Sequence, residues 1–160
     1  MTLDRRSFLI RAGLVVPGLA LTGFTQQEMP DPGAPVHIQN DDPGWTILNR
    51  AKVSIDEAKG LMTAVFDDAA KAMDGKPFTI GGFMLPLDAS QSFTHFVLTR
   101  RNTTCAFCPP NEPTEAIEIF TDTELSFTQD EYRVAGTLEL VGEASWGLFY
   151  RIHDAIVETM

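Results

Sequence analysis

The chain has 160 residues, of which 44% are apolar and 21% are charged, and its formal net charge is −10. This length predicts a single folded domain. The apolar fraction is that of a globular protein and is too high for a disordered chain. No apolar run reaches the roughly 20 residues that span a bilayer, which excludes a multi-pass membrane protein. Two cysteines are too few for a disulfide-rich mini-fold.

The first 25 residues have the features of an export signal. Arg5 and Arg6 precede a mildly apolar stretch over residues 12–24, which has the length of a signal h-region and is too short to span a membrane. The string Arg-Arg-Ser-Phe-Leu resembles a bacterial twin-arginine signal. We therefore predict a twin-arginine signal peptide over residues 1–25 and a periplasmic location. An ordinary secretory signal and an uncleaved anchor are the alternatives.

The charge balance limits the partners of the exported chain. The predicted signal holds three of the 12 basic residues and one of the 22 acidic residues, so the remainder is more acidic than the whole. Such a surface repels phosphate backbones and anionic lipid headgroups. We therefore expect no nucleic-acid partner and no polybasic docking to membranes.

The signal is followed by a predicted leader or linker over residues 26–44. This stretch contains four prolines and two glycines and shows no periodicity. We expect one globular domain over residues 45–160, with Trp45 and Leu48 docked on its core.

Residues 54–73 predict one amphipathic helix. Ser54 and Glu57 have the spacing of a capping box. Apolar residues then recur at helical intervals, and Gly75 supplies a stop signal.

From residue 77 the pattern changes to a period of two, which is typical of strands. The predicted strands cover residues 78–87, 93–99, 116–121, 132–141 and 148–157. Glycines inside the first and fourth of them indicate sharp bends, as at barrel corners. One N-terminal helix followed by five strands predicts a mainly β fold, a small five-stranded OB-like barrel. A curved α+β sheet is the alternative.

Both cysteines, Cys105 and Cys108, lie in a proline-rich segment between the second and third predicted strands. This spacing lets two sulfur atoms converge on one point, which suits a metal ion, a redox disulfide or a structural disulfide. Thiolate pairs bind Zn(II) and Cu(I), and His95 or His153 would complete the ligand set. His37 in the leader is a weaker candidate.

Two other interpretations of the cysteine pair stay open. A local structural disulfide formed after export fits the spacing as well as a metal does. Thiol–disulfide exchange fits less well, because the neighbouring prolines and strands are not the βαβ context of a thioredoxin motif. The chain also lacks the nucleophile-elbow, Walker, dinucleotide-binding and His-Glu-x-x-His motifs, so we expect no enzyme activity.

Residues 78–157 resemble a family of exported bacterial proteins of unknown function. The resemblance rests on Gly82-Phe83-Met84-Leu85-Pro86-Leu87, Phe96-Val97-Leu98, Cys105 with Pro109-Pro110, and Val134-Ala135-Gly136-Thr137-Leu138. Many relatives have Cys-x-His in the cysteine segment, where this chain has Phe107 and then Cys108. The resemblance implies a periplasmic accessory role in metal handling beside a membrane transport system, and it supplies no enzyme activity that could be transferred to this chain.

The sequence therefore predicts an exported, non-enzymatic protein that binds zinc or copper and serves a membrane transporter or another envelope protein. Its predicted ligands are Cys105 and Cys108, completed by His95 or His153. An interaction module with a structural disulfide and a thiol–disulfide exchange protein are the alternatives.

Overall fold

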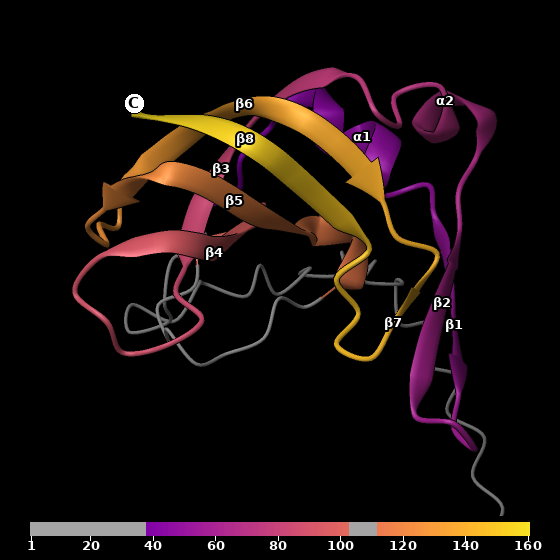
Figure 1. The fold of residues 1–160 in the computed structure, drawn as a ribbon. Helices are drawn as coiled ribbons and strands as arrows, with labels where there is room; N and C mark the ends of the chain where they lie inside the picture. The colour runs from indigo at the N-terminus through magenta and orange to yellow at the C-terminus, as the bar shows by residue number, and fades with distance from the viewer. Residues whose placement is uncertain (1–37, 103–111) are drawn as a thin grey trace, which may run out of the picture. The chain divides into compact units, whose positions relative to one another are not determined.

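The computed structural model describes residues 38–102 and 112–160 (Figure 1). Its helices are α1 (Pro43–Leu48), α2 (Asp68–Lys71) and the short 3-10 helix η1 (Pro113–Glu115). Its strands are β1 (Lys52–Asp56), β2 (Leu61–Val65), β3 (Pro77–Leu85), β4 (Phe93–Thr99), β5 (Ala116–Leu125), β6 (Glu131–Leu140), β7 (Glu143–Ala144) and β8 (Tyr150–Thr159). Within these ranges no helix has both the length and the apolar character needed to cross a membrane.

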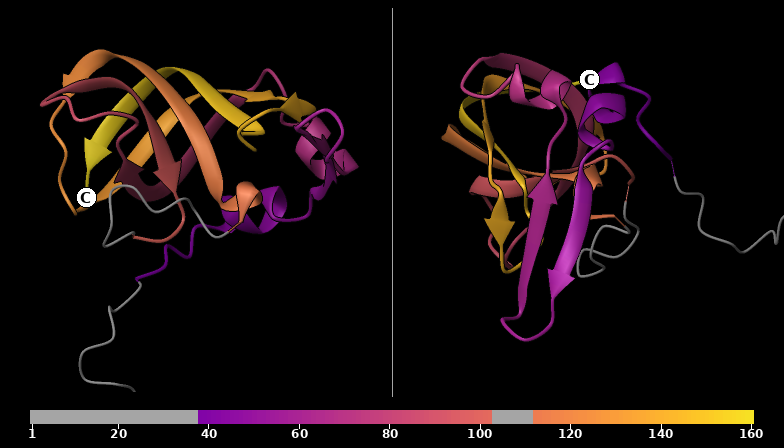
Figure 2. Two further views of the ribbon diagram at one scale, coloured as in Figure 1. Left: turned by 90° about the horizontal axis from the view of Figure 1, so that it is seen from below. Right: turned by 90° about the vertical axis from the view of Figure 1, so that its right-hand side faces the viewer.

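Five of the strands close into a barrel in the order β3-β4-β5-β8-β6. Figure 2 shows the curved strands from two further directions. Neighbouring strands run antiparallel except for β5 and β8, which pair in parallel. These strands correspond to the five segments predicted from the alternating pattern, and β4 has the predicted bounds. The prediction of a mainly β fold with a five-stranded barrel is therefore confirmed, and the barrel is closed, unlike the curved α+β sheet of the alternative.

The barrel core consists of the inward-pointing residues of each strand, because successive side chains of a strand alternate between its two faces. Many of them are β-branched, which suits a pleated sheet. The completely buried ones in mid-strand are Ile80, Phe96, Leu98, Ile117, Ile119, Val134, Leu138 and Ile152. Trp45 and Leu48 belong to the same apolar cluster, as predicted.

Helix α1 is attached to the barrel by two buried hydrogen bonds. Nε1 of Trp45 donates to the carbonyl oxygen of Gly81 on β3 at 2.8 Å. The hydroxyl of Tyr150 on β8 donates to the carbonyl oxygen of Leu48 at 2.7 Å. Burial raises the pKa of Tyr150 well above its ordinary value, so the hydroxyl keeps its proton and remains a donor.

The end of the predicted linker also contacts the barrel. Gln39 forms a bridge with Arg101, and the side chain of Asn40 donates to Glu131 at the start of β6. Asp42 accepts the backbone N–H of Gly44 and so caps α1. Residues 38–44 are therefore packed against the domain in the part of the linker that the structure describes.

The prediction of one amphipathic helix over residues 54–73 is wrong. The chain instead forms an antiparallel hairpin of β1 and β2, which projects from the side of the barrel, and then the short helix α2 (Figures 1 and 2). Ser54 does not cap a helix, because its hydroxyl is hydrogen-bonded to Thr63 across the hairpin at 2.6 Å. Asp67 is the residue that caps α2.

The physical reason is that the same residues also fit a period of two. Val53 and Ile55 alternate with polar residues, and β-branched side chains favour strands. Gly60 takes a φ of 64°, a left-handed conformation that suits glycine in a turn. Pairing of β2 with β7 then gives the hairpin a third strand. This pairing joins residues that are distant in the sequence, so the local pattern over residues 54–73 does not reveal it.

A β-bulge lies where β6 and β8 pair, at the bend that the sequence predicts around Gly136. Thr137 pairs with His153 and Ala135 pairs with Ile156. Gly136 alone separates the two partners on β6, whereas Asp154 and Ala155 separate them on β8, so β8 carries the extra residue. A Cβ atom at Gly136 would lie 2.5 Å from the carbonyl oxygen of His153. Only glycine allows this close approach.

We predict that Gly136→Ala destabilises the protein while Gly142→Ala does not. The added methyl group at 136 would collide with the backbone of β8, and overpacking of this kind costs about 1–3 kcal/mol or more. At Gly142 nothing lies within 4 Å of the added atom. Urea unfolding followed by circular dichroism measures both changes. Equal midpoints for the two variants would contradict the close approach of β6 and β8.

Candidate functional site

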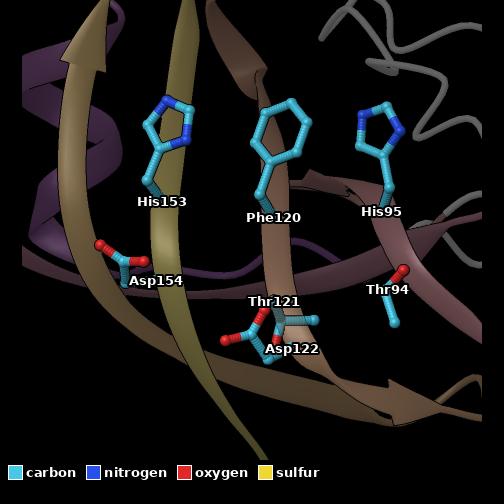
Figure 3. Close-up of a pocket in the computed structure, with 7 residues that line it drawn as sticks. All are labelled: Thr94, His95, Phe120, Thr121, Asp122, His153 and Asp154. Atoms are coloured by element: carbon cyan, nitrogen blue, oxygen red, sulfur yellow. The ribbon is translucent and has the colours of Figure 1, made fainter.

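The two candidate histidines within the described residues lie on one outer face of the barrel. His95 is on β4 and His153 is on β8, with β5 between these strands. Both side chains point outward because their neighbours Phe96 and Ile152 are completely buried in the core. Figure 3 shows the two imidazole rings standing on either side of Phe120 from β5.

The three rings form a stack across three strands. The centroids of His95 and Phe120 are 4.5 Å apart with an interplanar angle of 12°. The centroids of Phe120 and His153 are 5.0 Å apart with an interplanar angle of 6°. Because the phenyl ring lies between the two imidazoles, they cannot bind the same metal ion at the bond length of about 2 Å that metal–imidazole contacts have.

Each imidazole is held by its own carboxylate. Nε2 of His95 lies 2.8 Å from Oε1 of Glu118 on β5. Nε2 of His153 lies 2.7 Å from Oε2 of Glu139 on β6. A carboxylate accepts, so Nε2 carries the proton in both rings. Within the described residues, the hydrogen bonds of both rings are made by Nε2 and none by Nδ1.

Arg151 joins the two pairs into one network. Its Nε donates to Oε2 of Glu118 at 2.9 Å, and its Nη1 lies 3.7 Å from Oε2 of Glu139. Both oxygens of Glu118 are therefore engaged, one by an imidazole and one by a guanidinium. The side chain of Glu118 is only 14% exposed, which makes its ion pair stronger than the pair made by Glu139, which is 46% exposed.

Two irregularities of neighbouring strands shape the surface beside the ring stack. On β8 the bulge residue Asp154 has a φ of 51°, the left-handed region that aspartate enters more readily than most residues. The second irregularity lies where β4 pairs with β5. Phe93 pairs with Leu125 and His95 pairs with Phe120, so Thr94 on β4 stands opposite residues 121–124 on β5. Bulges of this kind redirect side chains and are frequent beside functional sites.

The result is an open polar pocket of about 350 Å³ beside the ring stack (Figure 3). Its lining consists of Thr94, His95, Phe120, Thr121, Asp122, His153 and Asp154. Phe120 and Asp122 were not predicted from the sequence as site residues. The local signal is the loss of apolar alternation after Phe120, and the stacking of Phe120 with the histidines depends on strand pairing between distant segments.

The structure leaves the other predicted site residues untested. Cys105 and Cys108 lie outside the described residues, as do Arg5 and Arg6 of the export signal. Within the described part of the chain, no group of three or more histidine, cysteine, aspartate or glutamate side chains is arranged to hold a metal ion. His95 and His153 are thus placed on the same face, but not as a shared ligand set.

Comparisons with known proteins indicate a family but no activity. The model of a family described as protein of unknown function (DUF3299) matches residues 29–147. A crystal structure of a DUF3299 family protein from Pseudomonas aeruginosa PAO1 has 20% sequence identity and a TM-score of 0.50, and the match covers 81% of this chain and 89% of that chain. At this identity the likeness concerns the fold alone. No curated protein matches the chain.

We predict that Glu118→Gln destabilises the protein more than Glu139→Gln does. Glu118 accepts two charge-assisted hydrogen bonds in a mostly buried position, and such bonds contribute on the order of 1–2 kcal/mol here. The more exposed Glu139 is expected to contribute less than about 1 kcal/mol. Urea unfolding at neutral pH compares the variants. An equal loss of stability would show that the network does not depend on Glu118.

Proposed function

This chain belongs to the DUF3299 family of proteins of unknown function, and from its own residues we propose that it is an exported metal-binding accessory protein. It is exported to the periplasm by the twin-arginine route and serves a membrane transporter or another envelope protein. It binds Zn(II) or Cu(I) through Cys105 and Cys108 and has no enzyme activity. The family resemblance of the cysteine segment and the export signal in the sequence support this proposal.

The observation that carries the proposal is the pairing of His95 with Glu118. A histidine that binds a metal commonly donates its second ring N–H to a carboxylate, which fixes the ring and makes the free nitrogen more basic. His95 has this arrangement: its Nε2 is hydrogen-bonded to Glu118, and Glu118 is itself held by Arg151.

His95 suits the cysteine pair better than His153 does. Cys105 and Cys108 follow β4, the strand of His95, in the sequence. The ring of Phe120 lies between His153 and β4. Two thiolates and one imidazole give three donors, which suits zinc with a fourth position open to an exchangeable ligand and also suits Cu(I). An open position is what a protein that passes a metal to a partner requires.

We assign the barrel to the OB type as part of the same proposal, since OB folds are small five-stranded barrels. The oligonucleotide binding that is common in OB folds is not part of it, because fold alone does not carry function. The site face presents the carboxylates of Asp122, Asp154 and Glu139, which repel a phosphate backbone.

We predict that the reduced full-length protein, purified without chelator, binds one zinc or copper ion per chain. Native mass spectrometry measures the stoichiometry, and competition with a chromophoric chelator measures the affinity. The double variant Cys105→Ser/Cys108→Ser should lose the ion. Both His95→Ala and Glu118→Gln should weaken binding about 10–100-fold, as loss of a ligand or of its supporting carboxylate does. Binding should also weaken as the pH falls, because protons compete for thiolates and imidazole.

The matched control is His153→Ala, which removes the other carboxylate-paired imidazole of the same stack and should leave the affinity unchanged. A chain that takes up no metal and is lighter by two hydrogens would overturn the proposal. It would favour the interaction module with a structural disulfide. A chain with no metal but a measurable, oxidising dithiol potential would favour thiol–disulfide exchange.

A further inference from the structure

Trp146 is the most exposed large apolar residue in the described part of the chain. It lies between β7 and β8, and 89% of its surface is exposed. It borders a groove of about 440 Å³ with a mainly apolar lining. Besides Trp146, the apolar residues of this groove are Leu85, Leu87, Val97, Ala116 and Leu148. An exposed tryptophan at the wall of an apolar groove is typical of a binding surface, where tryptophan is a frequent hot spot.

The floor of the groove is preformed. Leu85, Val97 and Ala116 come from three neighbouring strands, are buried, and pack with Leu148 as an apolar cluster separate from the barrel core. A second hollow of about 360 Å³ is also lined by Trp146, together with Leu61 and Leu148. The indole therefore borders both hollows, which lets an extended ligand contact it from either one.

The rim of this surface is acidic. Glu143 lines the second hollow, and Asp88 follows Leu87 of the first. Glu118 lines both hollows, but its two oxygens are already engaged by His95 and Arg151. Hydrogen bonds from Ser90 lower the pKa of Asp88, which keeps this carboxylate charged in mildly acidic solution. The described residues that line the first hollow include no lysine or arginine. Arg151 in the second hollow is paired with Glu118.

We propose that the groove beside Trp146 binds an extended segment of a partner protein in which apolar side chains are flanked by lysine or arginine. The apolar side chains cover the floor and the indole, and the basic side chains pair with the carboxylates of Glu143 and Asp88. This interaction does not require a metal. A second copy of the chain would bring a second acidic rim against the first, and like charges in contact disfavour that pairing. An anionic lipid surface is disfavoured for the same reason.

The first experiment uses two synthetic peptides with the same Leu-Val-Leu core, one flanked by lysines and the other by glutamates. The full-length protein is titrated into each fluorescein-labelled peptide and anisotropy is followed. We expect the lysine peptide to bind at least tenfold more tightly, and its binding to weaken as salt is raised. Trp45 is buried and Trp146 is exposed, and they are the two tryptophans of the chain. Binding should therefore shift the exposed indole's emission to shorter wavelength.

Trp146→Ala should weaken binding of the lysine peptide at least tenfold. Phe127→Ala is the matched control, since Phe127 is also an exposed aromatic residue but lies between β5 and β6, outside the residues that line either hollow. Circular dichroism checks that both variants are folded. Equal affinity for the two peptides, or equal loss in the two variants, would overturn the proposal. Cys105→Ser/Cys108→Ser should bind the peptide as the unmodified chain does, which separates this test from that of the metal site.

The second experiment identifies the natural occupant. A photoreactive amino acid replaces Trp146 in the full-length protein, in the cells that produce it, and the crosslinked residues are sequenced by mass spectrometry. The same substitution at Phe127 is the control. An adduct at 146 alone, to a partner segment with adjacent apolar and basic residues, supports the proposal. Crosslinks to a second copy, to lipid or to residues 103–111 of the same chain, or the absence of any adduct, would overturn it.

Discussion

Closure of the barrel depends on the short parallel contact between β5 and β8. The two pairs of residues that define it are Glu118 with Arg151 and Ile119 with Ile152. On the inner side the two isoleucines are completely buried in the core. On the outer side the carboxylate of Glu118 binds the guanidinium of Arg151. The hydrophobic contact and the ion pair therefore hold the same junction from opposite faces.

The candidate site is built on this junction, so fold and site share residues. Two positions after Glu118 and Arg151, on the same outer face, Phe120 and His153 stack against each other. Glu118 then extends the contact to His95 on β4. Rigid strands position these side chains better than loops do, and a network in which each carboxylate has a partner limits their movement. A substitution in the site is therefore also a substitution in the structure that closes the barrel.

The strands were predictable from the sequence because several of them alternate apolar and polar residues, and others are short apolar runs. Tyr132, Val134 and Leu138, which are more buried than their neighbours, illustrate the alternation for β6. The bounds of β4 agree with the prediction. The hairpin of β1 and β2 was not predictable in this way. Its residues also fit a helical period, and the choice between the two depends on pairing with Glu143 and Ala144, which follow about eighty positions later.

The candidate site was predictable in part. Histidine is a common ligand, so His95 and His153 could be named from the sequence, and strand order places them on one face. Their separation by Phe120 could not be foreseen, because it depends on the register of three strands. For the same reason Glu118 and Glu139 were not recognised as partners of the histidines. Register is set by long-range packing, which no local pattern records.

The extra residue in β8 changes which side chains of the strand point into the core. Before the bulge, Ile152 points into the core and His153 points outward; after it, Ala155 points inward and Ile156 outward. If β8 continued without the bulge, strict alternation from Ile152 would bring Asp154 and Ile156 to the inner face and turn Ala155 out. The small side chain that now faces the crowded end near Gly136 would be exchanged for a large one. A single residue thus sets which face of the C-terminal half of β8 belongs to the interior.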